Sequence, residues 1–373
     1  MDELLAGIIE KGLELKASDI HLRHSREPLY RIDGIIQSLG GHILLDEDLG
    51  RFFNELLDSK LQSQFKLLND LDFAKCLSLS TCNVRTRVNV FLSQGHLGFV
   101  IRLINSQILD LDTLGFPDFT LEKVKHLLCS PRGLLLVVGP TGSGKSTTLA
   151  AMIDFINKKF NKHIITIEDP IEYIYQSNQS IITQRELGKD TPSFQKALAG
   201  ALRQDPDVIL LGEMRDLATI EAAVSAAETG HLVLSTLHTT GSTRTVDRII
   251  DAFPDGSRDL VRTQLASNLI GVISQTLCRR KEGMGRLPAF EIMLHSDAIA
   301  NLIRENKTFR IQTEIEVGQN AGMLPLDKHL FQLWQQGAIS NEEALLVALD
   351  PAALRLRMNN VVVTKPKKSF FSF

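Results

Sequence analysis

The first third of the chain mixes hydrophobic patterns of two periods. Apolar residues recur at helical spacing in three segments, which predict helices over residues 4–15, 45–53 and 56–65. Shorter apolar or alternating runs predict strands over residues 18–22, 28–32, 85–91 and 98–104. Together they predict a small α+β domain.

The pattern changes after Gly115 and Pro117, which predict a linker. A helical segment at residues 121–128 follows. Short, wholly apolar runs then alternate with helical stretches, at residues 134–138, 164–167, 208–211 and 232–236. Strands that are apolar on both sides are typical of a parallel sheet between helices. Past Pro288 the spacing turns helical, at residues 297–304, 326–335 and 341–349.

Composition narrows the class of protein. The 373 residues include 41 Lys and Arg against 44 Asp and Glu, a net charge of -3, which excludes gross basicity as a basis for nucleic-acid binding. No window approaches the roughly 20 apolar residues that cross a bilayer, and the first residues do not have the pattern of a signal peptide, so we expect a cytosolic protein. The cysteines form no CxxC pair, which argues against a disulfide framework or a cysteine zinc site; they are Cys76, Cys82, Cys129 and Cys278.

One segment carries a strong signal for phosphate binding. Residues 139–146 read GPTGSGKS and fit G-x-x-x-x-G-K-[ST] between an apolar strand and a helix. Glycines let the backbone wrap phosphate oxygens, Lys145 adds a charge for the β and γ phosphates, and the Ser146 hydroxyl can bind Mg²⁺. The expected binding residues are Gly139, Pro140, Thr141, Gly142, Ser143, Gly144, Lys145, Ser146 and Thr147.

Acidic residues follow two other predicted strands. Glu213 follows the run at residues 208–211, where an acid can hold Mg²⁺ directly or through water. Asp207, at the start of that run, is interpreted as a turn residue after Pro206. Residues 168–172 contain three carboxylates; they form either a solvated loop or, beside a phosphate loop, a catalytic acid that polarises the attacking water.

Two histidines flank the strand at residues 232–236. His231 precedes it and His238 follows it. Each could be a buried, satisfied imidazole; the pair favours a role as a sensor of the γ-phosphate.

These segments resemble, in order, the motifs of the type II/IV secretion ATPase superfamily: GPTGSGKST (139–147), TIEDPIEY (166–173), DPDVILLGEMRD (205–216) and AAETGHLVLSTLHTT (226–240). Within it the chain resembles the retraction ATPases of type IV pili, over residues 18–327. The resemblance implies an α/β fold with a PAS-like α+β domain at 1–113, a linker at 114–118, a RecA-like P-loop NTPase core at 119–290, a helical subdomain at 291–350 and a flexible tail at 351–373.

The resemblance also implies roles for individual residues. It makes Glu172 the catalytic glutamate, Glu213 the Walker B glutamate, and His231 and His238 the His box. Arginines of the N-terminal domain reach the nucleotide in this family, some from the neighbouring subunit, and Arg85, Arg87 and Arg102 fall on the matching strands. A guanidinium suits this task because it offers two parallel donors and stays charged; a solvated surface arginine is the alternative.

The implied machine is a homo-hexamer that hydrolyses ATP with Mg²⁺ to power pilus retraction and twitching motility. It would dock at the inner-membrane base of the pilus on a platform protein, with only peripheral membrane association, no nucleic acid, and possible cooperation with a paralogous pilus ATPase. The chain departs from the family in having Ala300 where a C-terminal signature has arginine, and no arginine in the hairpin at 93–96. The alternatives are an accessory retraction paralogue or other secretion ATPase, a non-catalytic partner subunit and a nucleic-acid translocase.

Overall fold

The computed structural model describes residues 2–32, 34–79, 83–104, 108–282 and 285–360. Contacts between residues divide the chain into two compact units, each described here by itself. The first unit consists of Met1–Ile108 and Asp169–Gln176, and the second of Leu109–Glu168 and Ser177–Phe373. Eight residues from the middle of the second unit's sequence therefore pack with the first unit.

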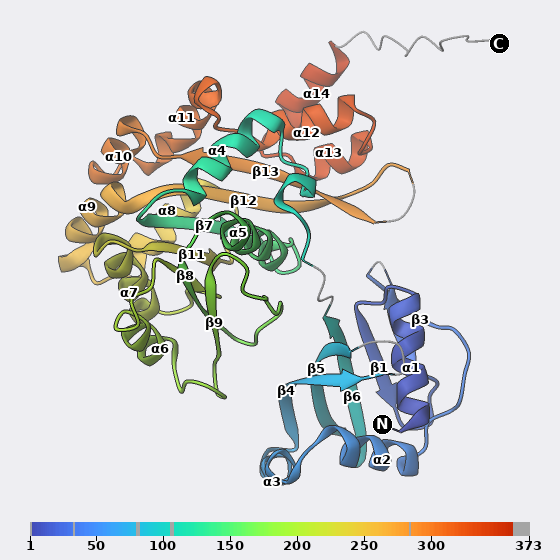
Figure 1. Cartoon of the computed structure of the whole chain (residues 1–373). Helices are drawn as coiled ribbons and strands as arrows, with labels where there is room; N and C mark the ends of the chain where they lie inside the picture. Colours follow the sequence, from blue (N-terminus) through green and yellow to red (C-terminus); the bar gives the residue numbers. More distant parts are fainter. Residues whose placement is uncertain (1, 33, 80–82, 105–107, 283–284, 361–373) are drawn as a thin grey trace. The chain divides into compact units, whose positions relative to one another are not determined.

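In its described residues, the first unit is an antiparallel sheet of six strands with three α-helices (Figure 1). The strand order is β3-β2-β1-β6-β5-β4. The strands are β1 (Asp19–Arg23), β2 (Leu29–Ile32), β3 (Ile35–Ser38), β4 (Asp70–Ser78), β5 (Asn83–Ser93) and β6 (His96–Ile104). The helices are α1 (Glu3–Glu14), α2 (Asp46–Leu56) and α3 (Ser59–Leu68).

Apolar side chains at helical spacing fix α1 and α2 against this sheet. Leu5, Ile9 and Phe52 are fully buried in one core with Ile20 and Ile101 of the strands. The helices and strands predicted from the sequence in this region are confirmed. Strand β4 was not predicted, and only one of its residues is fully buried.

The second unit is built on a seven-stranded sheet in the order β13-β12-β7-β11-β10-β8-β9. All neighbouring pairs are parallel except β12 and β13. The strands are β7 (Gly133–Val138), β8 (His163–Glu168), β9 (Ile181–Glu186), β10 (Val208–Leu211), β11 (Leu232–Leu237), β12 (Leu269–Arg279) and β13 (Arg286–Leu294). Every residue of β7, β10 and β11 is buried, which confirms the prediction of strands covered on both faces.

Eleven α-helices belong to the described part of this unit. The first five are α4 (Asp118–Leu128), α5 (Lys145–Lys159), α6 (Phe194–Ala201), α7 (Leu217–Glu228) and α8 (Ser242–Asp251). The others are α9 (Arg258–Asn268), α10 (Asp297–Arg304), α11 (Ile311–Val317), α12 (Leu326–Gln335), α13 (Asn341–Val347) and α14 (Pro351–Asn359). The helices predicted from the sequence in this region are all present.

Strands β9 and β12 were not among the predicted strands, and three further features of this unit differ from the sequence-based expectation. Residues 288–294, expected at the start of a helical region, continue β13 because Phe290 and Ile292 are buried in the sheet. Phe116 of the expected linker is buried, and its ring stacks on Phe290 at 4.1 Å. Residues 351–359, expected as tail, form α14, which Asp350 caps and whose Leu354 packs in a core cluster. The rest of that tail, 361–373, and Cys82 lie outside the described residues.

Candidate nucleotide-binding site

The phosphate-binding loop joins the end of β7 to the start of α5 in the second unit. Gly142 and Gly144 have φ of 77° and 88°, in the left-handed region that glycine adopts without strain. Gly139 is required by close approach, because a Cβ there would lie 2.1 Å from the carbonyl oxygen of Gln275. No side chain caps the first turn of α5. Its amide groups and positive dipole end therefore suit an anion.

A buried glutamine that belongs to no recognised motif holds this loop. Gln275 of β12 is buried, and its Nε2 donates to the carbonyl oxygen of Ser143 at 2.7 Å. Its Oε1 accepts a hydrogen bond from Thr148 Oγ1 at 2.7 Å, so one side chain ties the loop to the first turn of α5. Sequence motifs missed it because it lies more than a hundred residues further along the chain; the apolar run around it was the only local signal.

Lys145 is buried at the start of α5, with its ammonium turned back over the loop. Its Nζ donates to the carbonyl oxygens of Gly139 at 2.9 Å and Pro140 at 3.0 Å. The buried hydroxyl of Ser143 has no hydrogen-bond partner among the described residues, and a Cβ on Gly142 would meet only open space. The loop thus presents cationic and donor groups around an open position, as a phosphate group requires.

The acid and one histidine predicted for this site do come together. His238 Nε2 lies 3.0 Å from Glu213 Oε1, and its Nδ1 lies 3.4 Å from Lys145 Nζ. A neutral imidazole protonated at Nε2 satisfies both contacts, donating to the carboxylate and accepting from the ammonium. Glu213 Oε2 accepts a second hydrogen bond, from Arg215 Nε at 2.7 Å. Imidazole and carboxylate therefore connect the end of β10 to the phosphate loop.

Magnesium would find hard oxygen ligands here. Ser146 is exposed in the first turn of α5, and Glu213 supplies a carboxylate at the end of β10. Hydroxyl and carboxylate oxygens, completed by waters and phosphate, are the donor set that Mg²⁺ prefers. The residues predicted as metal ligands thus have the chemistry for the ion.

The structure does not bring His231 into this group. The residue precedes β11 at the amino end of the sheet, where its Nδ1 lies 3.0 Å from the carbonyl oxygen of Ala226. His238 follows the same strand at the carboxyl end, roughly 20 Å away for seven residues of extended chain. Asp207 also lies at the amino end and accepts hydrogen bonds from Lys162 Nζ and the His163 amide, as expected of a structural turn residue.

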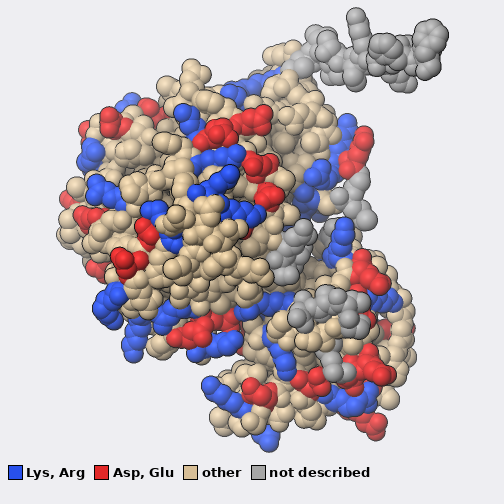
Figure 2. Space-filling model, in the orientation of Figure 1, with Lys and Arg blue, Asp and Glu red and all other residues tan. Residues whose placement is uncertain are grey.

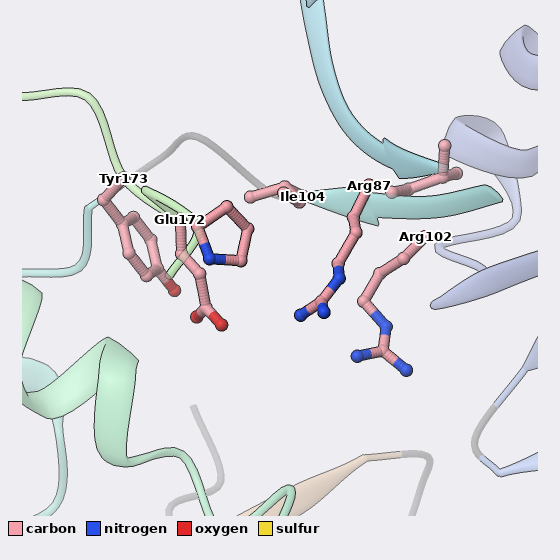
Figure 3. Close-up of a pocket in the computed structure, with 7 residues that line it drawn as sticks. Arg87, Arg102, Ile104, Glu172 and Tyr173 are labelled. Carbon is pink, nitrogen blue, oxygen red and sulfur yellow. The ribbon is translucent and has the colours of Figure 1, made fainter. Parts of the chain in front are cut away.

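Glu172 and two of the predicted arginines line a pocket in the first unit (Figure 3). The pocket holds about 180 Å³ and is lined by Arg87, Arg102, Leu103, Ile104, Pro170, Glu172 and Tyr173. Arg87 and Arg102 are directly opposite each other on β5 and β6, so their side chains share one face of the sheet. In Figure 3 both guanidinium groups extend to the same side, facing the Glu172 carboxylate across the pocket.

Acidic neighbours orient both guanidinium groups. Arg87 Nε donates to Asp72 at 2.8 Å, and its Nη2 bonds the same carboxylate. Arg102 Nε donates to the buried Asp19 at 2.9 Å. The Asp72 carboxylate raises the pKa of Arg87 above its ordinary value, and the charges of Asp169 and Glu172 act in the same direction. Arg85 lies two residues before Arg87 on β5, opposite Ile104.

The first acid of the cluster at residues 168–172 has a structural role within the second unit. Glu168 ends β8 and is buried, and its Oε1 accepts hydrogen bonds from Thr166 Oγ1 at 2.7 Å and Gln184 Nε2 at 3.3 Å. The next residues, from Asp169 to Gln176, belong to the first unit. The cluster is therefore divided between the two units rather than forming one solvated loop.

Three further observations concern the chain outside the site. Within the described residues, none of the helices combines the length and the apolar character needed to span a bilayer. Figure 2 shows Lys and Arg side chains interspersed with Asp and Glu over the visible face of the larger unit. Ala300, where we expected a departure from the family signature, is buried on α10.

Comparison with known proteins places these features in a wider group. Residues 1–283 match the family described as type II/IV secretion system protein. The type IV pilus retraction ATPase PilT of Pseudomonas aeruginosa is 44% identical over 343 residues, 92% of this chain and 96% of that protein. The pilus ATPase PilU of the same organism is 36% identical over 356 residues, 95% of this chain and 90% of PilU. A crystal structure of the pilus retraction motor PilT with bound ADP superimposes with a TM-score of 0.85 at 41% identity, covering 94% of this chain and 99% of the other.

Proposed function

The chain belongs to the type II/IV secretion system protein family, and we propose that it is an ATPase motor that powers retraction of a type IV pilus. The observation that carries this proposal is the arrangement at the carboxyl edge of the second unit's sheet. There the phosphate loop, Lys145, Glu213 and His238 form one hydrogen-bonded group in a chain that is 44% identical to a pilus retraction ATPase.

The phosphate loop would bind the triphosphate. Its amide groups and Lys145 exchange their bonds within the loop for bonds to the β and γ phosphates. Ser146 and Glu213 would hold Mg²⁺, directly or through water, and when bound it would supply positive charge beside the phosphates. His238 would hold Glu213 in its orientation and would respond to movement of Lys145, because it contacts both side chains.

The first unit would supply the remaining groups. Glu172 accepts a proton from the attacking water, and Arg87 and Arg102 stabilise charge that develops on the γ-phosphate. Hydrogen bonds to Asp72 and Asp19 hold the two guanidinium groups in place. Each guanidinium has further N–H donors with which it can bind phosphate. His231 lies at the other end of β11, so a role in hydrolysis would be indirect.

We extend the proposal to the assembly. The first unit would be a PAS-like domain and the second a RecA-like motor with a helical C-terminal region, six copies forming a ring. Closure of the ring's subunits around ATP and release after hydrolysis would turn an inner-membrane platform protein from the cytoplasmic side. The chain's higher identity to PilT than to PilU supports a principal rather than an accessory motor.

The enzymatic part is tested with purified variants. Lys145→Ala should lose nucleotide binding and turnover, whereas Glu172→Gln should bind nucleotide but release no phosphate. Lys159→Ala, which removes an exposed lysine at the other end of α5, is the matched control and should behave as the wild type. Full turnover by Lys145→Ala would refute the assignment of the phosphate loop.

The direction of the motor is tested in cells. Cells that lack this chain should carry surplus pili and fail to move on surfaces, because extension continues without retraction. Complementation with wild-type chain should restore motility, and complementation with Lys145→Ala should not. Cells without any pili would contradict retraction and indicate a role in assembly.

A further inference from the structure

We propose that the first unit binds a divalent transition-metal ion of the zinc class through His24, Asp46 and His96. These residues lie just after β1, at the first position of α2 and at the start of β6. One ligand atom of each lies within 4.8 Å of the other two. The group lies at one end of the sheet. Arg102 lies toward the other end, six residues or roughly 20 Å further along β6.

The contacts within this group converge on a single oxygen. Asp46 Oδ1 lies 3.0 Å from His24 Nδ1 and 2.8 Å from His96 Nδ1. His96 makes a hydrogen bond with the carboxylate. His24 Nδ1 does not: it is shielded from solvent and has no hydrogen-bond partner among the described residues. A cation bound to both His24 Nδ1 and the Asp46 carboxylate would give this solvent-shielded nitrogen a partner.

The two imidazole rings lie face to face beside the same carboxylate. They stack at 3.9 Å with an angle of 5° between their planes. Each ring turns its Nδ1 toward Asp46, so one ion at this position can reach a nitrogen of both rings. Two nitrogens on one tetrahedral ion point along directions about 109° apart. Binding would therefore tilt the stacked rings away from each other.

The donor set selects the class of ion. Two imidazoles and one carboxylate suit Zn²⁺, Co²⁺ or Ni²⁺, whereas Mg²⁺ and Ca²⁺ prefer oxygen ligands alone. A water would complete the tetrahedron, since all three side chains are partly exposed. The positive end of the α2 dipole disfavours a cation, but the negative charges of the three consecutive acidic residues at 46–48 offset this effect. The ion would tie the β5–β6 hairpin to β1 and α2.

A matched control lies in the same unit. His42 Nε2 and Asp48 Oδ2 are also 3.0 Å apart, but this pair has a single histidine. It reproduces one half of the proposed site and is not expected to hold a transition metal. The proposal does not depend on nucleotide hydrolysis, so its outcome is separate from that of the proposed function.

The experiment is a calorimetric titration of the purified full chain with Zn²⁺ in excess Mg²⁺. The wild type and His42→Ala should bind one zinc ion per chain at this site, and the double variant His24→Ala, His96→Ala should bind it at least ~10-fold more weakly. Equal zinc binding by the wild type and the double variant would overturn the proposal, as would the absence of binding by the wild type.

A second measurement does not rely on the variant's folding. In the wild-type chain with ¹⁵N-labelled histidine, Zn²⁺ should shift the Nδ1 resonances of His24 and His96 together and leave those of His42 unchanged. Zinc should also raise the melting temperature of the wild type, because it binds the folded unit. Unchanged Nδ1 resonances of His24 and His96 at saturating zinc would overturn the proposal.

Discussion

Gln275 shows how much of the phosphate loop's shape depends on a side chain outside the motif. Its amide bonds both the loop, at Ser143, and the helix, at Thr148. Its side chain also favours glycine at position 144, and its backbone carbonyl requires glycine at position 139, because a Cβ at either position would lie within 3 Å of these atoms. Glycines at these positions are thus required by the close approach of β12 as well as by the close approach of phosphate.

Replacing this residue should loosen the loop. We expect Gln275→Leu to lower the stability of the second unit by about 1–3 kcal/mol, because the Ser143 carbonyl and the Thr148 hydroxyl lose their buried partner. Nucleotide affinity should fall with it, as measured by titration with a fluorescent ATP analogue. Gln332→Leu, on α12, is the control. Unchanged affinity in a folded Gln275→Leu chain would contradict a positioning role.

At the scale of single elements, α10 explains the departure at Ala300. The helix buries Ile299, Ala300 and Ile303. An arginine at position 300 needs space and a partner for its charge, and the small side chain fits a helix that packs closely on α9. In this chain the family's signature has therefore been adapted to the local packing.

The corresponding prediction is that restoring the signature destabilises this chain. Ala300→Arg should cost about 1–3 kcal/mol from overpacking alone, with the buried charge adding to the cost. Thermal unfolding would record a lower melting temperature. Asn301→Arg introduces the same charge on the exposed side of the helix and should leave the melting temperature unchanged. Equal stability of the two variants would show that α10 accommodates the arginine.

A second element-scale prediction concerns α12. Burial lowers the pKa of His329 to about 4, and its Nδ1 accepts a hydrogen bond from the Phe290 amide. Between pH 6.5 and 4 the unfolded chain binds the proton more readily than the folded chain. Stability should therefore fall with acidification through this window, by up to about 3 kcal/mol, and His329 should have no such effect above pH 6.5.

The measurement is denaturant unfolding at several pH values between 7.5 and 4.5. His329→Gln should lose this part of the pH dependence, whereas His126→Gln, which replaces an exposed histidine on α4, should keep it. The same pH dependence in the wild type and His329→Gln would show that other groups govern the acid response.

The buried strands and amphipathic helices could be predicted because their patterns are local. Strands β7, β8, β10 and β11 are continuous apolar runs, and the motif at residues 139–146 fixed the position of the phosphate loop. Strand β9 could not be predicted, since most of its residues are half-buried and its place in the sheet depends on parallel pairing with β8 across an intervening loop. The same reason hid Gln275: hydrogen bonds between distant segments leave no periodic trace in the sequence.

For the whole molecule, the proposed ring raises a choice between arginines from the same subunit and arginines from its neighbour. The pocket of Arg87, Arg102 and Glu172 lies in the first unit, and the phosphate loop lies in the second. The sequence could name both groups of residues. It could not predict that Asp169–Gln176 would pack with the first unit, because this depends on tertiary contacts rather than on a motif.

A mixing experiment addresses this question. Chains with Arg87→Ala and Arg102→Ala should be inactive, as should chains with Lys145→Ala. If arginines act across a ring interface, mixed assemblies should recover turnover, because some interfaces then combine intact arginines with an intact phosphate loop. Phosphate release would be measured after co-purification with two tags. Mixed assemblies as inactive as their parents would place the arginines and the loop in the same subunit.

Because residues 169–176 pack with the first unit, the two units cannot be separated by cutting the gene at one point. Neither unit is encoded by one uninterrupted stretch, since the chain passes between them three times. A fragment that ends at residue 108 would lack the buried side chains of Ile171 and Tyr175. Recombination between relatives at a single crossover near residue 108 would likewise join a first unit from one parent to an eight-residue patch from the other. Functional chimaeras should therefore need two further exchange points, at either side of that patch.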